Sequence, residues 1–291
     1  MKHLAQNATQ TAHIDHFHPC WLQAVVVPMP PDAQPVKAVI LDTETTGLEP
    51  SDQVIEVALL PVLFDARTSA LYAIGEPYVA QQDPGVPLQP IITKVTGIVD
   101  ADLKGKTIDW PLVREYLAEA DMVVAHNAQF DRGMIDRTLN VKGLPLKRKL
   151  WACTINHLDW DEVIPSAPAK KLPVLSVWSG FWYDAHRADV DVQALLYLLL
   201  QHKQLGVLYT NAQKPTYDLA ARGAHISKKD VLKARKYQWD ADNRYWHKGL
   251  PDMEAVEAEV KWLGESVYFV ADAWGMCGQA KRVDPLTRYG V

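Results

Sequence analysis

The chain has 291 residues, of which 48% are hydrophobic and 22% charged, which is usual for a folded globular protein and excludes a largely disordered chain. The formal net charge of −5 excludes nucleic-acid binding through bulk positive charge, so such binding would depend on local patches or bound metal ions. Three widely spaced cysteines, a polar N-terminus and short apolar runs predict a soluble cytoplasmic protein without a disulfide framework, a signal peptide or a membrane partner.

Residues 1–36 predict an arm of irregular or partly ordered structure, because they mix histidines with the proline-rich segment 27–32 and hold no periodicity. The arm contains His13, His16, His18 and Cys20. Their spacing is not that of a closed zinc site, so a mobile or packed arm is favoured over a metal cluster.

From residue 37 the pattern becomes that of a layered domain. Apolar runs predict strands over 38–41, 54–64, 71–80, 122–125 and 150–153. Helical spacing of apolar residues predicts helices over 108–119, 132–139 and 188–202. Strands first and helices interleaved later predict an α/β domain over residues 37–205.

Residues 206–291 predict a linker and a small α+β C-terminal domain. A strand is expected over 217–221, a helix over 228–237 and a final helix over 252–266. Between the helices, residues 238–249 predict a hairpin whose turn is Asp240–Asn243.

Two carboxylates stand at the end of the first predicted strand, in the string Asp42-Thr-Glu-Thr-Thr-Gly47. Residues two apart in a strand face the same side, so Asp42 and Glu44 point together. Adjacent carboxylates repel each other, and a divalent cation with oxygen ligands removes that repulsion. A lone Asp-x-Glu would favour a solvated strand end, but the six-residue string is far more specific.

A third acid, Asp131, follows the strand 122–125 and the polar residues His126 and Asn127, at the start of a predicted helix. The segment by itself favours a helix N-cap over a ligand.

Asp191 begins another predicted helix and shares a face with four apolar residues, Ala194, Leu195, Leu198 and Leu199. An unpaired carboxylate on the core side is costly, and no lysine or arginine shares this stripe, so a metal ion is the expected partner. His186 precedes the helix by about a turn and can approach the same point. The alternative is a surface His186 and an Asp191 that is favoured by the helix dipole.

Together these segments resemble the DEDDh, or DnaQ-like, exonucleases, which include the proofreading subunit of bacterial DNA polymerase III, ribonuclease T and oligoribonuclease. The resemblance covers about residues 37–202 and rests on 42–47, on 127–131 and on the HxAxxD pattern of His186, Ala188 and Asp191. A weaker match is 96–99, where Thr96 replaces the histidine of many polymerase-type relatives. The segment 153–175 looks closer to a freestanding bacterial branch. The resemblance implies a ribonuclease-H-like α/β fold, with a five-stranded mixed sheet flanked by helices.

The resemblance also implies a metal-dependent 3′–5′ exonuclease that releases nucleoside 5′-monophosphates from single-stranded or frayed 3′ ends, with DNA favoured as the substrate. It implies two Mg²⁺ or Mn²⁺ ions per active site, a replication or repair protein as a partner, and His186 as the base that takes a proton from water. The implied metal ligands and catalytic acids are Asp42, Glu44, Asp131 and Asp191.

Two alternatives stay open. An RNA exonuclease of the ribonuclease T or oligoribonuclease type would share every motif. A non-catalytic nucleic-acid-binding or scaffold protein on the same fold would need none of the acids or His186, and their presence disfavours it.

The sequence also predicts substrate contacts. In the exonuclease domain these are Thr45, Thr46, Gly47, Leu48, Thr96, His126, Asn127 and Phe130. Residues 222–248 have a surplus of five positive charges interleaved with aromatic residues, which favours a nucleic-acid surface that includes Lys233, Arg235 and Lys236. The alternative is a small domain core in which Trp239 and Trp246 pack.

Overall fold

The computed structural model describes residues 14–49, 51–146 and 148–290. Contacts within the chain divide it into two compact units. The first unit extends to Asn211 and also includes the C-terminal residues from Tyr289, and the second unit is Ala212–Arg288. No helix in these described ranges is long and apolar enough to cross a bilayer.

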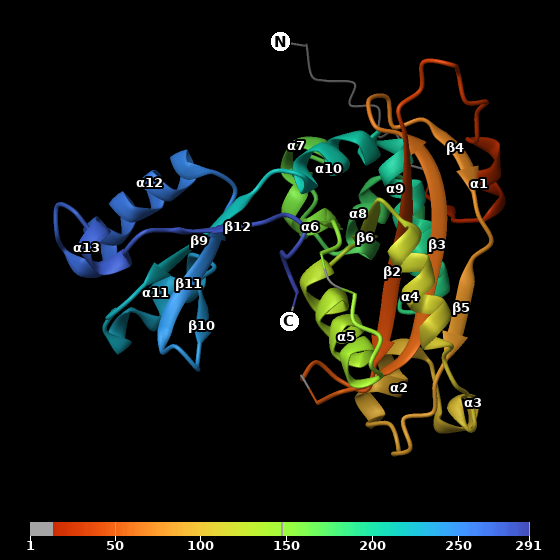
Figure 1. Cartoon of the computed structure of the whole chain (residues 1–291), viewed down its shortest axis with the longest axis horizontal. Coiled ribbons are helices and arrows are strands. Elements are labelled where there is room, and N and C mark those ends of the chain that lie inside the picture. The colour runs from red at the N-terminus through yellow and green to blue at the C-terminus, as the bar shows by residue number, and fades with distance from the viewer. Residues whose placement is uncertain (1–13, 50, 147, 291) are drawn as a thin grey trace, which may run out of the picture. The chain divides into compact units, whose positions relative to one another are not determined.

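A six-stranded mixed sheet forms the centre of the first unit (Figure 1). Its strands are β2 Pro35–Thr45, β3 Val54–Asp65, β4 Leu71–Ile74, β5 Tyr78–Gln81, β6 Met122–Ala125 and β7 Trp151–Cys153. The order is β4-β3-β2-β6-β7, and β5 also pairs with β3. β2 runs antiparallel to β3 and parallel to β6. The prediction of a mixed α/β sheet is confirmed.

The predicted strand over 71–80 is instead two strands, which is why the sheet has six strands and not five. Gly75 and Pro77 separate β4 from β5. Because Pro77 has no N–H to donate to a ladder, the pairing with β3 is interrupted between the two segments.

Helices cover both faces of this sheet (Figure 1). α4 Trp110–Glu119 and α5 Ala128–Val141 pack on one face, where they bury a continuous apolar core with β2, β3, β6 and β7. α9 Ala188–Gln201 packs on β2 and β3, with α8 Leu172–Trp178 beside it. The remaining helices of the unit are α1 Cys20–Ala24, α2 Pro90–Thr96, α3 Asp100–Leu103, α6 Thr154–His157, α7 Trp160–Val163 and α10 Leu205–Ala212.

The described part of the N-terminal arm packs against the first unit. β1 Asp15–His16 pairs in parallel with β8 Phe181–Trp182, and α1 contacts α9. Phe17 and Leu22 are buried in this contact. His16, His18 and Cys20 do not come together as a group of metal ligands, and His13 lies outside the described residues.

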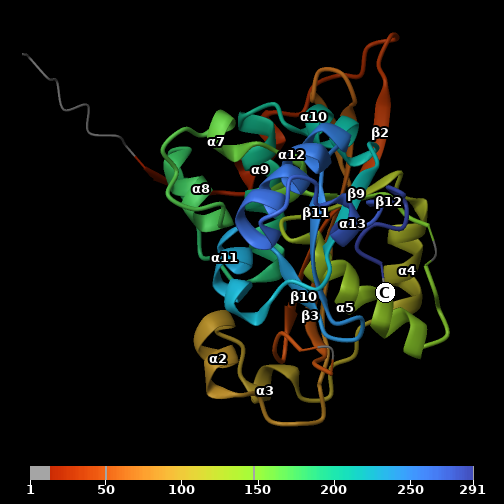
Figure 2. The ribbon, with the colours of Figure 1, turned by 90° about the vertical axis from the view of Figure 1, so that its left-hand side faces the viewer.

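The second unit is a four-stranded antiparallel sheet with helices packed on its buried side (Figure 2). Its strands are β9 Thr216–Ala221, β10 Gln238–Asp240, β11 Tyr245–Leu250 and β12 Lys281–Val283. Its helices are η1 Ile226–Lys228, α11 Lys229–Ala234, α12 Met253–Leu263, η2 Gly264–Tyr268 and α13 Trp274–Cys277. The predicted hairpin is confirmed, and the Asp240 carboxylate accepts hydrogen bonds from Asn243 across its turn.

Candidate active site

Three acids from two elements come together beside β2. Asp42 and Glu44 lie on the same side of the strand, and each offers a carboxylate oxygen within 4.8 Å of the other and of Asp191. The register with β3 shifts between Glu44 and Thr45, which marks a β-bulge. The bulge ends regular pairing directly after the second acid, as bulges beside active sites commonly do.

Asp191 is oriented by two hydrogen bonds. The Tyr183 hydroxyl donates to Oδ1 at 2.8 Å, and the Arg187 backbone N–H donates to Oδ2 at 2.9 Å. The four apolar residues that share its face of α9 are buried, as predicted: Ala194, Leu195, Leu198 and Leu199. The carboxylate of Asp191 is therefore held at the sheet side of the helix.

Asp131 approaches Asp42 from a different side. It is only 3% exposed, and its Oδ1 accepts a hydrogen bond from the Thr43 hydroxyl at 2.9 Å. Asn127 occupies the N-cap position of α5, so the interpretation of Asp131 as the helix cap is wrong. Asp131 stands outside the group of three close acids, although its charge still raises the pKa of Asp42.

The acids make protonation easier in this site than in water. Burial, followed by repulsion from Asp131 and Asp191, raises the pKa of Asp42 well above its usual range. Burial and the charge of Asp191 raise the pKa of Glu44 to about 8, and burial raises the pKa of Asp131 to about 7. A set of donors that consists of carboxylate oxygens fits a hard divalent cation, which would relieve this repulsion.

This electrostatic arrangement predicts that stability depends on pH and metal. In the folded protein the pKa values of Glu44 and Asp131 lie above the ordinary carboxyl value of about 4. The metal-free folded protein therefore binds more protons than the unfolded chain. Its free energy of unfolding should therefore fall as the pH rises from about 4 to about 8. At pH 8, Mn²⁺ at about 100 times its Kd should restore about 2.7 kcal/mol.

Thermal unfolding from pH 5 to pH 8, in EDTA and in Mn²⁺, measures this effect. Asp42→Asn removes one charge without removing bulk, so it should flatten the decline in EDTA and weaken the stabilisation by Mn²⁺. An equal decline in the variant, or no stabilisation of the parent by Mn²⁺, would contradict the assignment of these acids.

His186 lies on the exposed loop between β8 and α9. Its φ of 69° is left-handed, which is uncommon for a residue other than glycine. Its backbone and its charge both act on the Asp191 carboxylate. The fold thus brings the predicted base next to Asp191, one of the three close acids.

Glu56 and Arg187 are site residues that the sequence analysis missed. Glu56 on β3 is 1% exposed, and it accepts hydrogen bonds from Arg187, from the Ala188 N–H and from Gln81. A lone acid inside the apolar run 54–64 was the available signal, because a buried carboxylate needs partners. Thr43 and Tyr183, which orient Asp131 and Asp191, had no comparable signal.

The loop after Glu44 is held in one shape by its own polar groups. The Thr45 hydroxyl donates to the Gly47 carbonyl, and the Thr46 hydroxyl donates to Asp52. A Cβ at Gly47 would lie 2.4 Å from Oδ2 of Asp52, so a larger residue there would displace this carboxylate from its hydrogen bonds to Thr46 and Glu49. Leu48 follows and is 82% exposed. Substrate contacts by residues 45–48 stay predictions, and the fixed loop with a protruding leucine is compatible with them.

Two other predicted contacts have side chains that are engaged within the protein. The ring nitrogens of His126 bond to the Thr154 hydroxyl and the Lys170 carbonyl, both at 2.7 Å, and burial lowers the pKa of His126 to about 4. The Thr96 hydroxyl donates to Ile92 and accepts from the Ile98 N–H. These bonds give both side chains a structural role and leave their substrate contacts as predictions.

The last two predicted contacts of this domain lie around the start of α5. Asn127 is exposed and Phe130 is partly buried against the core. Both remain predictions as substrate contacts.

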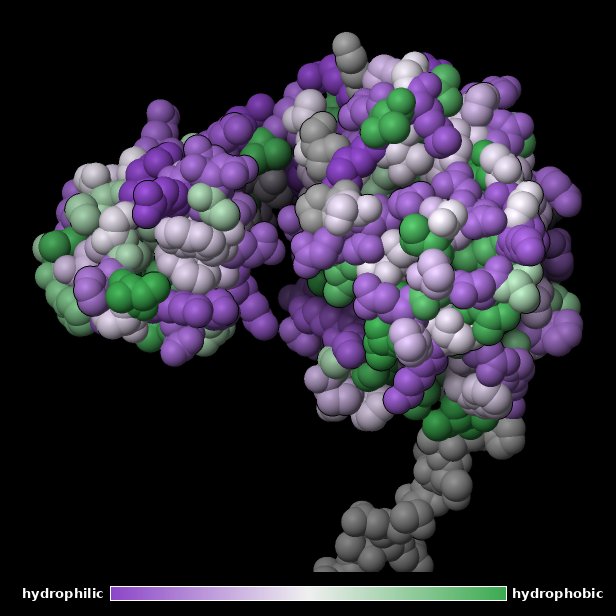
Figure 3. All heavy atoms as spheres, turned by 90° about the horizontal axis from the view of Figure 1, so that it is seen from below, coloured by the Kyte–Doolittle hydropathy of each residue, from purple (hydrophilic) through white to green (hydrophobic). Residues whose placement is uncertain are grey.

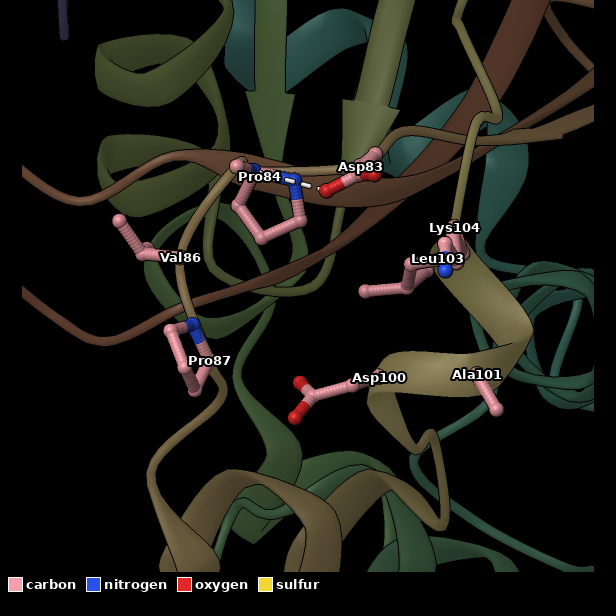
Figure 4. A pocket seen from close by; sticks show the side chains of 9 residues that line it. Asp83, Pro84, Val86, Pro87, Asp100, Ala101, Leu103 and Lys104 are labelled. Carbon is pink, nitrogen blue, oxygen red and sulfur yellow. Dashed lines mark hydrogen bonds between the residues drawn. The ribbon is translucent and has the colours of Figure 1, made fainter.

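A separate hollow of about 350 Å³ lies at the loops around α3 (Figure 4). The carboxylates of Asp83 and Asp100, which line this hollow, accept hydrogen bonds from the backbone N–H groups of Gly85 and Leu88, respectively. These carboxylates therefore order the loops, and none of the predicted site residues lines the hollow.

In the second unit, the basic residues are divided between internal and solvent-facing roles. Arg235 bonds to the buried Glu259 and lies over the Trp262 ring, whereas Lys233 and Lys236 are exposed and make no ion pair with any residue of the described ranges. Trp246 is buried and Trp239 is 50% exposed. The packed-core interpretation thus holds for Trp246, and Trp239 remains at the surface.

Known proteins resemble this chain in the segment that contains the acids and His186. Residues 39–199, more than half of the chain, match the family model RNase_T, described as Exonuclease. The chain belongs to this exonuclease family. The exonuclease match contains Asp42, Glu44, Asp131, His186 and Asp191.

Curated relatives match parts of the exonuclease segment. The DNA polymerase III PolC-type protein of Listeria monocytogenes is 36% identical over 165 residues, which are 55% of this chain and 11% of the relative. The DNA polymerase III subunit epsilon-like protein of Rhodobacter capsulatus is 32% identical over 103 residues, which are 34% of this chain and 14% of the relative. The chain thus spans only a small part of the length of these relatives.

Solved exonucleases share the fold. The zinc-bound form of an E. coli ExoI–ssDNA complex aligns with a TM-score of 0.55 at 14% identity, over 87% of this chain and 76% of that chain. An exonuclease I in complex with the inhibitor BCBP aligns with a TM-score of 0.50 at 15% identity, over 64% of this chain and 49% of that chain. The ribonuclease-H-like α/β architecture is therefore confirmed.

Proposed function

We propose that this member of the exonuclease family hydrolyses nucleic acids from the 3′ end with two bound divalent cations, Mg²⁺ or Mn²⁺. The observation that carries the proposal is the convergence of Asp42, Glu44 and Asp191. Asp131 lies close enough for its charge to act on Asp42, and His186 lies next to Asp191. A scaffold or purely binding role would require none of this costly clustering of buried charge.

Each side chain has a distinct role in the proposed reaction. Asp42, Glu44, Asp131 and Asp191 would hold the cations, which supply charge stabilisation at the phosphate and make water a better nucleophile. Tyr183 and the Arg187 N–H keep Asp191 oriented, and Thr43 does the same for Asp131. His186 takes a proton from the attacking water at an imidazole nitrogen.

The contacts of the 45–48 loop support a role in substrate binding. Asp52 accepts hydrogen bonds from the Thr46 hydroxyl and the Glu49 N–H, and Leu48 between them is 82% exposed. We propose that this loop contacts the terminal nucleotide, which places the last phosphodiester at the acids.

We propose DNA as the substrate and a replication or repair protein as a partner, because the curated relatives are named as DNA polymerase III proteins. Single-stranded DNA and RNA of one sequence, each incubated with Mg²⁺ or Mn²⁺, would test this choice. Chromatography should show nucleoside 5′-monophosphates that form faster from DNA. Faster release from RNA would assign the chain to the ribonuclease alternative.

We propose that the second unit binds the strand beyond the terminal nucleotide. Neutralising Lys233, Arg235 and Lys236 together should raise KM for long oligonucleotides and flatten its salt dependence, because fewer phosphate contacts release fewer counterions. Hydrolysis of a nitrophenyl nucleotide ester should stay unchanged, since so small a substrate reaches only the acids. Because Arg235 is already paired with Glu259, replacing Lys233 and Lys236 alone should produce most of the effect.

A matched control is the neutralisation of three other exposed basic residues of the same unit, Lys261, Lys281 and Arg282. It removes the same charge at other positions and should change KM less. If both triple variants have the same KM as the parent for long and for short substrates, the second unit does not hold the strand.

A further inference from the structure

An ion pair with a buried carboxylate joins the sheet to the loop that carries His186. The side chain of Glu56 is 1% exposed, and that of its partner Arg187 is 45% exposed. Nη2 of Arg187 lies 3.1 Å from Oε1 of Glu56, and the Ala188 N–H donates to Oε2 at 3.1 Å. Gln81 on β5 donates to the same carboxylate at 2.8 Å. Glu56 thus holds two consecutive residues at the start of α9.

The segment that Glu56 holds connects directly to the proposed chemistry. Arg187 follows His186, and its backbone N–H donates to Asp191. His186 has a left-handed backbone, which needs support from its neighbours to persist. The pair therefore fixes the turn between the proposed base and a proposed metal ligand.

Strand stability does not explain an acid at position 56. Glu56 lies directly opposite Glu44 in the β2–β3 ladder, and like charges in that position repel. Its charge also contributes to the raised pKa of Glu44, which Arg187 partly offsets. A buried carboxylate and its partner can often be replaced by apolar residues without loss of stability, so this pair needs another reason.

We propose that Glu56 and Arg187 are positioning residues, which keep His186 and Asp191 aligned with Asp42 and Glu44. This proposal rests on the proposed exonuclease function. Glu56 touches neither substrate nor reacting water in this account. It acts through the Arg187 side chain and the Ala188 N–H, as outer partners of metal ligands do.

Glu56→Gln keeps the size of the side chain and removes its charge. We expect kcat on a nitrophenyl nucleotide ester to fall by about 10-fold to 100-fold, while KM stays within about 2-fold of the parent. Arg187→Met should have a similar effect. The double variant should lose no more than the worse single variant, because the two residues act as one unit. Arg187→Lys, which keeps the charge, should recover part of kcat.

The second unit contains a matched control. Glu259 and Arg235 form a pair with the same 3.1 Å distance and nearly the same exposures, 5% and 44%. Glu259→Gln removes the same kind of buried charge in the other unit. It should change the melting temperature and leave kcat on the nitrophenyl ester unchanged.

Three outcomes decide the proposal. Selective loss of kcat in Glu56→Gln and Arg187→Met, without loss in Glu259→Gln, supports it. Parent-like kcat in folded Glu56→Gln and Arg187→Met overturns it, and so does an additive double variant. The proposed function fails separately, if the parent itself releases no 3′ nucleotides or if Asp42→Ala is as active as the parent.

Discussion

Asp42→Ala and Asp191→Ala are each expected to abolish hydrolysis, with a loss of at least ~10³-fold, while the chain stays folded. Both acids belong to the group whose oxygens lie within 4.8 Å of one another. Without either acid, the divalent cations lose a ligand, and their stabilisation of the phosphate in the transition state is lost with them. This stabilisation is worth several kcal/mol, and each ~1.4 kcal/mol changes the rate tenfold. The metal-free variants should be no less stable than the parent at pH 8, because one repelling charge is gone.

Asp189→Ala is the control for these variants. Asp189 lies in the same first turn of α9 but outside the close group of acids. Its replacement should leave most of the activity, which would separate a general loss of helix stability from loss of the cation site. Near-parental activity in folded Asp42→Ala would falsify the metal assignment.

The second large effect is expected at the proposed base. His186→Ala should lose at least ~10²-fold in kcat, the lower end of what general base catalysis contributes. The variant should still be stabilised by Mn²⁺ at pH 8, because the four acids remain. Asp42→Ala should lose that stabilisation, so the two variants separate proton transfer from cation binding.

An unchanged rate in His186→Ala would show that another group activates the water. Loss of Mn²⁺ stabilisation together with the rate would instead assign His186 to cation binding. Both results can be obtained from one set of purified variants by thermal unfolding and initial-rate measurements.

Much of the site could be predicted because its acids stand at the ends of regular elements. Asp42 and Glu44 lie in β2 directly after its apolar run 38–41, and Asp191 lies on the apolar stripe of α9, so strand and helix periodicity alone indicate where each carboxylate points. The predicted number of strands was wrong because an apolar run does not show where its pairing with a neighbouring strand is interrupted. Only the structure shows that β4 and β5 pair with different parts of β3.

The supporting contacts could not be predicted in the same way. Glu56 and Arg187 are 131 residues apart, and Thr43 and Asp131 are 88 apart, so no local spacing links them. The preference for aspartate at helix starts made Asp131 look like a cap, but Asn127 is the N-cap of α5, and Asp131 instead accepts a hydrogen bond from Thr43 on β2. The internal pairing of one predicted C-terminal contact, Arg235, was hidden for a related reason. Charge along the sequence does not reveal that Arg235 is neutralised by Glu259.

The most direct test of the central claim is a time course on a single-stranded DNA oligonucleotide labelled at its 5′ end, with Mg²⁺ and with EDTA. The proposed 3′–5′ exonuclease should produce a ladder of labelled strands that shorten one nucleotide at a time, and EDTA or Asp42→Ala should stop it. Immediate release of the 5′ label as a mononucleotide, or a few fragments from internal cuts, would contradict the proposed direction. An undiminished ladder in EDTA would contradict the role of the cation site formed by Asp42, Glu44 and Asp191.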